Sequence, residues 1–273
     1  MIKTTKEQGI EIRKQIQKEF ENLNKNKPSH NEKLWTYYVA CIIDHSQVKR
    51  KEEYLRMFVG TKENIESISE IWFEAQPIPP RKGFYGKSEG NTKLDLAFGG
   101  IRQRSYTQTG IEYDSFKDWV CFVEAKFLSD CSGKTSYDPF RNQLARVIEN
   151  MICFQNEKGE RPKRYIFSLL TPRKFRNAEN RKTRLFGYKY EDYHVDRAKL
   201  LDDIKLGEIA KREDSKWEYP QDFNERVKNK LSMSWVAYEE IIEKELGIEG
   251  LDVIEPGKHW QAILEKMKEY LKE

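Results

Sequence analysis

Cysteine and histidine are scarce in this chain, and neither is arranged to bind a metal. The sequence has four residues of each kind. The cysteines include no CxxC pair and show no zinc spacing; they are Cys41, Cys121, Cys131 and Cys153. Two of them lie in apolar runs, where a buried free thiol is the ordinary interpretation. A zinc site and thiol catalysis are therefore not expected.

Long apolar runs are also missing. The first residues, MIKTTKEQG, are polar, and no segment has the length and apolarity of a transmembrane helix. We therefore expect a cytoplasmic protein in a reducing compartment, with no membrane partner. The formal net charge of +4 is small. It permits a polyanionic partner such as DNA without requiring one.

Several catalytic motifs are absent as well. The sequence has no HExxH, no GxSxG and no GxGxxG. Gly86-Lys87-Ser88 looks like the end of a phosphate-binding loop, but Arg81 stands where that loop needs a glycine, and a strand-like run follows. Lys87 lies in a glycine-rich basic loop, which is either a contact for a phosphate backbone or an exposed turn.

The most informative stretch is WVCFVEAKF, residues 119–127, which has the composition of a buried β-strand. Glu124 and Lys126 interrupt it, although an unpaired buried charge is very costly. Side chains alternate along a strand, so these two point to the same face, roughly 6–7 Å apart. One face of the strand therefore presents a carboxylate beside an ammonium group.

A second strand-like run, TKLDLAF at residues 92–98, carries another acid. Asp95 lies on the face opposite to that of Leu94, Leu96 and Phe98. Two acids and one lysine on adjacent antiparallel strands make a cation site, and Mg²⁺ takes one or two carboxylates and keeps several waters. The lysine would orient or activate a metal-bound water, or stabilise charge on a phosphate.

The pattern Asp95…Glu124-Ala125-Lys126 resembles the PD-(D/E)XK nucleases, which have the restriction-endonuclease-like fold. The resemblance covers roughly residues 28–172 and departs at Leu94, where the family motif has proline. It implies that Asp95, Glu124 and the Ala125 carbonyl bind Mg²⁺, with Mn²⁺ as a substitute, and that Lys126 is the catalytic lysine. The interval GGIRQRSYTQTGIEYDS is expected to form an extended hairpin.

Two further polar residues lie at expected helix starts. In Ser29-His30-Asn31-Glu32, Glu32 either completes a capping box with Ser29 or, as the resemblance suggests, lies near the metal. Downstream, Asp138 and Pro139 predict the start of a helix with a buried apolar face. On its polar side, Gln143 either faces the site, as the resemblance implies, or belongs to the ordinary helix surface.

The order of elements predicts an α/β protein with a mixed central sheet flanked by helices. We expect an N-terminal helix in residues 1–27, a nuclease-like core in residues 28–187 and a mainly helical region packed on it in residues 188–273. Within the core, helices or helical turns are predicted at 48–58 and 61–70, and further strands at 71–75 and 164–172. A long amphipathic helix is predicted from Phe223 to Leu246.

The most basic stretch follows the last predicted core strand. Between Arg161 and Arg184 there are nine lysines or arginines and one acid, Glu179. Such a segment suits contacts with phosphates, whose affinity falls steeply with salt, or is simply a solvated charged loop. The candidate contacts for nucleic acid are Arg173, Lys174, Arg176, Arg181, Lys182 and Arg184.

Three functional hypotheses follow. The first is a Mg²⁺-dependent endonuclease that hydrolyses DNA, such as a restriction or defence nuclease, for which cutting both strands favours a homodimer. The second is a catalytically inactive nucleic-acid-binding module of the same fold. The third is a helical interaction protein in which Asp95, Glu124 and Lys126 form a structural ion-pair cluster, although a buried ion pair is a poor stabiliser of an apolar strand.

Overall fold

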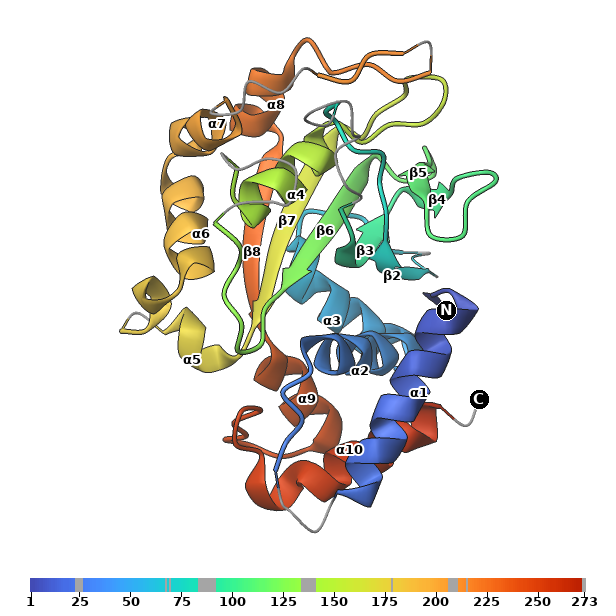
Figure 1. Ribbon diagram of the computed structural model, residues 1–273, viewed down its shortest axis with the longest axis vertical. Helices are drawn as coiled ribbons and strands as arrows, with labels where there is room; N and C mark the ends of the chain where they lie inside the picture. The colour runs from blue at the N-terminus through green and yellow to red at the C-terminus, as the bar shows by residue number, and fades with distance from the viewer. Residues whose placement is uncertain are drawn as a thin grey trace.

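The central element of the computed structural model is a six-stranded mixed β-sheet (Figure 1). The structure describes residues 1–271 except 23–26, 67, 69, 83–91, 134–140, 178, 206–210 and 215. In spatial order the strands are β1 (Ile2–Lys3), β2 (Ile71–Ala75), β3 (Leu94–Gly99), β6 (Trp119–Ala125), β7 (Arg164–Thr171) and β8 (Leu231–Ala237). The strands β2, β3 and β6 form an antiparallel meander, whereas β6, β7 and β8 are parallel.

Helices cover both faces of this sheet. On one face lies α4 (Gln143–Ile152), in front of β6 and β7 in Figure 1. The other face carries α2 (Glu32–His45) and α3 (Val48–Val59), as the ring contact between Phe58 and Phe98 on β3 shows. The protein is therefore an α/β structure with helices on either side of a mixed sheet.

The remaining helices extend these two layers. The helices α6 (Leu185–Val195), α7 (Arg197–Lys205) and α8 (Phe223–Asn229) lie near α4, and the short α5 (Arg173–Arg176) and η3 (Arg181–Thr183) precede them. Against α2 pack α1 (Lys6–Glu21), α9 (Tyr238–Leu246) and α10 (Trp260–Tyr270), the last preceded by η4 (Gly257–His259). No helix in the described ranges is long and apolar enough to cross a membrane.

An aromatic cluster joins the second group of helices to the end of β6. Trp35 of α2 stacks on Phe127 at 5.4 Å between ring centroids and contacts Trp260 at 5.3 Å. Tyr238 of α9 meets Phe127 edge to face. Such pairs bury large rings and hold a fixed geometry. Phe127 follows Lys126 directly, so the cluster fixes the backbone where β6 ends.

Most predicted elements of the first two thirds of the chain are confirmed. The N-terminal helix, the strands at 71–75, 92–98, 119–127 and 164–172, and the helix at 48–58 are all present. The insert after β3 forms a hairpin of β4 (Ile101–Gln103) and β5 (Ile111–Tyr113). The segment 61–70, predicted as a helix or helical turn, forms no helix among its described residues, although the Ile68 N–H donates to the Ile65 carbonyl across one turn.

The predicted helix from Phe223 to Leu246 is wrong in its middle third. The chain forms α8, then β8, then α9, and β8 pairs in parallel with β7 along its whole length. The apolar positions of LSMSWVA alternate, and this strand period lies between two amphipathic helical segments. The expected boundary at 187/188 therefore divides the sheet, and the region 188–273 is not purely helical.

Candidate active site

The pairing of β3 with β6 brings the two predicted acids together. Leu96 is opposite Val123, so the next position along the ladder sets Asp95 opposite Glu124, on the same face of the sheet. The backbone N–H of Ala125 donates to Asp95 Oδ2 at 2.7 Å. The two carboxylates are thus neighbours at the point where the antiparallel pairing ends.

Glu124 is buried, with only one of its oxygens satisfied. Its Oε1 lies 2.8 Å from Lys126 Nζ and also accepts a hydrogen bond from Gln143 Nε2. Its Oε2 is buried and has no hydrogen-bond partner among the described residues. A buried carboxylate oxygen without a donor is costly unless a ligand occupies it.

Lys126 lies just beyond the last residue of β6 and binds three acceptors. Its Nζ donates to the Ala125 carbonyl at 2.9 Å and lies 3.3 Å from Glu32 Oε1, in addition to the contact with Glu124. The ammonium group is therefore held in place by β6 and by α2.

Glu32 does not form the predicted capping box with Ser29. The N-cap of α2 is Asn31, whose side chain accepts from the Leu34 N–H, so the capping role is already filled. Glu32 instead reaches the end of β6: its Oε2 accepts from the Phe127 N–H at 2.9 Å and from Ser129 Oγ at 2.8 Å. The structure thus gives Glu32 a place in the site.

Gln143 is the first residue of α4, and its side chain lies in the site. Its amide bridges Glu124 and the loop after β6, because Oε1 accepts from the Ser132 N–H at 3.3 Å. The N-cap of α4 is Asn142, whose side chain accepts from the Ala145 N–H. The predicted cap Asp138 and Pro139 lie outside the described residues.

The sequence analysis missed a third acid on the meander. Glu74 of β2 lies opposite Asp95, between the pairs Phe73–Leu96 and Ala75–Leu94. Its φ of +50° lies in the left-handed region, which is rare for a residue with a side chain. The carboxylate binds Lys33 at 3.0 Å and Gln8 at 3.1 Å, so Glu74 links β2 to α1 and α2.

The surroundings raise the pKa values of all three central groups, Asp95, Glu124 and Lys126. Burial raises the pKa of Asp95 well above its usual range, and the nearby carboxylates of Glu124 and Glu32 raise it further. Burial also raises the pKa of Glu124, although Lys126 opposes the shift. Burial acts to lower the pKa of Lys126, but Glu124, Asp95 and Glu32 outweigh it and raise that pKa. Lys126 is therefore a permanent cation at neutral pH.

The donor set fits a hard divalent cation with few protein ligands. Within the described ranges, no three His, Cys, Asp or Glu side chains come together to hold a metal ion. Asp95 and Glu124 supply two carboxylates, and Mg²⁺ binds one or two while it keeps several waters. The unpartnered Oε2 of Glu124 is the atom that most needs such a ligand. The Ala125 carbonyl, the third expected ligand, already accepts from Lys126.

Part of the basic segment has a structural role. Arg173 forms a two-bond ion pair with Glu243 of α9, at 2.5 and 3.1 Å. Arg176 pairs in the same way with Glu240, at 2.6 and 2.8 Å. These paired geometries anchor α5 to α9. The two arginines, predicted to contact nucleic acid, are thus already bound to carboxylates.

The other predicted cations lie near the start of α6. Lys174 and Arg184 flank the Phe175 ring at 5.1 and 5.3 Å from its centroid, and Arg181 lies 5.8 Å from the Trp235 ring. Lys182 is exposed. Lys87 lies outside the described residues.

Asp130 connects this basic surface to the site, and the sequence analysis missed it. Its carboxylate accepts from the N–H groups of Leu185 and Phe186 at 2.8 and 3.2 Å, at the first turn of α6. Asp130 follows Lys126 by four residues. The loop that leaves the site therefore holds the start of α6, which directly follows the basic segment.

Comparison of this chain with models of known protein families, with curated proteins and with solved structures gave no match.

Proposed function

We propose that this protein is a Mg²⁺-dependent endonuclease that hydrolyses phosphodiester bonds of DNA, with a site of the PD-(D/E)XK kind. The observation that carries the proposal is the convergence of Asp95, Glu124 and Lys126 on one face at the end of β6, where Glu124 Oε2 is buried and has no hydrogen-bond partner among the described residues. If the carboxylates of Asp95 and Glu124 had faced opposite sides of the sheet, the proposal would have no basis.

The order of elements around the site gives further support. A helix, α2, precedes the meander β2, β3 and β6; α4 follows, and β7 returns beside β6. This is the order that the resemblance implies: an acid on one strand, an acid-x-lysine on the next and then a helix. Glu32 and Gln143, one from each flanking helix, both reach this site.

Each residue has a distinct role in this proposal. Asp95 and Glu124 would hold Mg²⁺, which when bound activates water for attack on phosphorus and offsets charge on the phosphate. Lys126 stays protonated among carboxylates, so it stabilises negative charge that develops on the phosphate and does not serve as a base. Glu32 and Gln143 position Lys126 and Glu124 through hydrogen bonds.

The basic segment that Asp130 links to the loop after β6 supports the proposal of a polyanionic substrate. Lys174, Lys182 and Arg184 belong to the segment that Asp130 ties to the loop after β6. Cations of this segment would contact phosphates of the backbone and hold the scissile bond in register.

The test is cleavage of plasmid and of single-stranded DNA by purified protein in Mg²⁺, in Mn²⁺ and in EDTA. We expect cutting in both metals, none in EDTA and none by Lys126→Ala. Lys93→Ala is the matched control, because Lys93 is an exposed lysine just before β3 and should cut like the wild type. Salt-sensitive DNA binding without cutting would favour the inactive module, and absence of both would remove the proposal.

A further inference from the structure

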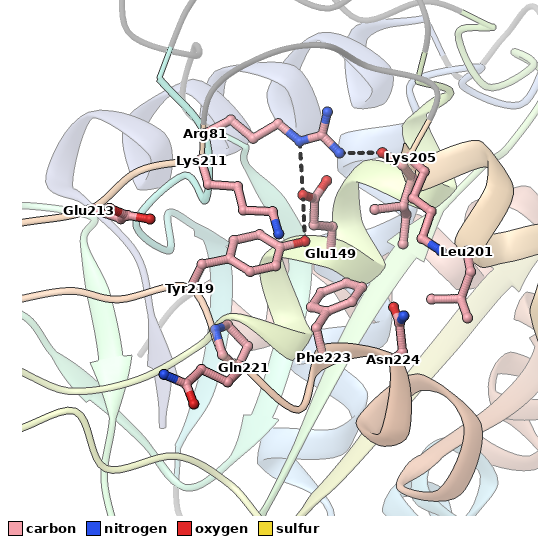
Figure 2. A pocket seen from close by; sticks show the side chains of 12 residues that line it. Arg81, Glu149, Leu201, Lys205, Lys211, Glu213, Tyr219, Gln221, Phe223 and Asn224 are labelled. Carbon is pink, nitrogen blue, oxygen red and sulfur yellow. Dashed lines mark hydrogen bonds and ion pairs between the residues drawn. The ribbon is translucent and has the colours of Figure 1, made fainter.

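A cavity of about 450 Å³ lies at the far end of α4 from the candidate active site (Figure 2). It opens between α4, α7, α8 and the segment 211–221. Glu149, on its floor, follows Gln143 by six residues on the same helix. Volumes of about 300–1,000 Å³ are typical of small-molecule sites.

The floor is a fixed arrangement of buried charge. Glu149 is fully buried; its Oε1 accepts from Arg81 Nε at 2.8 Å and from the Tyr219 hydroxyl at 3.2 Å, and its Oε2 accepts from Arg141. Arg81 also donates to the carbonyl of Ile204. These bonds join α4 to the end of α7 and to the segment 211–221, so the cavity is rigid where it is deepest.

Two lysines enter the cavity from opposite sides (Figure 2). Lys205 comes from the end of α7 and Lys211 from the facing segment, and Lys211 Nζ lies 4.3 Å from the centroid of the Tyr219 ring. Neither lysine forms an ion pair within the part of the chain that the structure describes, and Glu213 is the one acid on the cavity walls besides Glu149. The walls therefore favour an anion.

The rest of the lining suits a flat, polar-edged group. Phe223 stacks on Tyr219 at 5.0 Å between centroids, and Leu201 and Ile204 add apolar surface. Asn224 brings a carboxamide, with donors and an acceptor, to the same cavity (Figure 2). A carboxamide beside apolar and aromatic walls matches the edge and the face of a nucleobase.

We propose that this cavity binds a nucleotide, with its phosphates at Lys205 and Lys211 and its base between the Phe223 wall and Asn224. A mononucleotide is the simplest ligand that meets both halves of the lining, because an inorganic anion leaves the Asn224 carboxamide and the aromatic wall unused, and a neutral base leaves the lysines unused. The site is separate from the proposed nuclease centre and does not depend on its activity.

The test is binding to the full-length protein in EDTA, which keeps the proposed metal site out of the measurement. The ligands are ATP, AMP, adenosine and inorganic phosphate. Binding of each is measured by calorimetry and by the change in the midpoint of thermal unfolding. We expect ATP and AMP to bind and to raise the midpoint, and adenosine and phosphate to bind at least tenfold more weakly.

The variants separate the two halves of the cavity. The double variant Lys205→Ala with Lys211→Ala should weaken AMP and ATP at least about a hundredfold, because it removes two charged hydrogen bonds to the phosphates and each contributes about tenfold or more. Asn224→Ala should weaken AMP without changing phosphate. Lys216→Ala is the matched control, because this exposed lysine of the same segment does not line the cavity.

Three results would overturn the proposal: no binding of ATP or AMP at millimolar concentration, equal binding of AMP and phosphate, or affinity for AMP that survives loss of both lysines. Binding of an oligonucleotide without any binding of mononucleotides would also overturn it. Both lysines are exposed, so their variants should fold, and unfolding midpoints without ligand verify this.

Discussion

Two buried carboxylates differ in how their oxygens are satisfied. Glu124 of β6 lies beside the first residue of α4, and Glu149 lies near the other end of that helix. Both oxygens of Glu149 accept hydrogen bonds, from Arg81, Arg141 and Tyr219. Glu124 shares one oxygen between Lys126 and Gln143 and leaves the other without a partner in the described chain.

The comparison separates a structural acid from one prepared for a ligand. A buried carboxylate whose partners are complete needs nothing more, and its network ties helices together. A buried carboxylate that faces a second carboxylate, with one oxygen unbound, is stabilised when a cation arrives. The same substitution at the two positions should therefore have opposite consequences.

Glu149→Gln should produce the largest loss of stability. It removes the charge that two buried guanidinium groups share, and breaking a buried ion pair typically costs about 3–5 kcal/mol. Urea unfolding followed by circular dichroism measures the change. A loss below about 1 kcal/mol would mean that the network contributes little, and the contrast with Glu124 would disappear.

Glu124→Gln should leave stability within about 1 kcal/mol of the wild type and abolish function instead. Burial already disfavours the charged form, as the raised pKa of Glu124 indicates, and Lys126 keeps Glu32 and the Ala125 carbonyl as acceptors, so the substitution leaves no unpaired cation. We expect DNA cleavage to fall by about a hundred- to thousandfold, the scale for losing one group that stabilises transition-state charge. Cleavage that persists in this variant would contradict the assigned role.

Glu239 offers a third buried carboxylate between these extremes, with the Arg173 N–H as a donor at 2.8 Å. Burial raises its pKa to about 7. A raised carboxyl pKa means that the folded state binds the proton of Glu239 more tightly than the unfolded state does. The stability that the folded protein gains from this proton is complete below pH 4.5 and is lost as the pH rises through 7. The loss is at most about 3 kcal/mol. Glu239→Gln should remove that decline, and unfolding of both proteins from pH 4.5 to 8 measures it; parallel curves would show that Glu239 ionises normally.

Mg²⁺ should stabilise the wild type and not Glu124→Gln or Asp95→Asn. Binding only to the folded state adds about 2.7 kcal/mol at a hundred times the dissociation constant. Because the pKa values of Asp95 and Glu124 are raised, protons compete with the metal, and the stabilisation should grow as pH rises from 6 to 8. Thermal unfolding with Mg²⁺ and with EDTA tests this. Equal shifts in all three proteins would place the cation elsewhere.

The core of the candidate site could be predicted because its residues depend on local rules. Side-chain alternation set Glu124 and Lys126 on one face, and a hairpin between the two strands set Asp95 beside them. Gln143 was a candidate only because the resemblance implies a polar residue from the helix after the strand, and the structure places it at the first position of α4. The placement of the two acids and the lysine needed only the strand period and the order of elements.

The parts that could not be predicted depend on contacts between distant segments. Nothing near Arg173 or Arg176 in the sequence indicates that both are bound to acids of α9, about 65–70 residues later. Glu32 has a complete local explanation as part of a capping box, and only the packing of α2 against the end of β6 overrides it. The strand β8 is stabilised by β7, not by a local propensity strong enough to end the helical pattern around it.

The place of β8 in the sheet has a consequence for biosynthesis. A ribosome must have made and released the chain beyond Ala237 before β7 can acquire its outer neighbour. Until then, β7 is an unprotected apolar edge whose free N–H and C=O groups can pair with another chain. Nascent or truncated forms that end before β8 should therefore be the species that chaperones retain and that aggregate when chaperones are limiting.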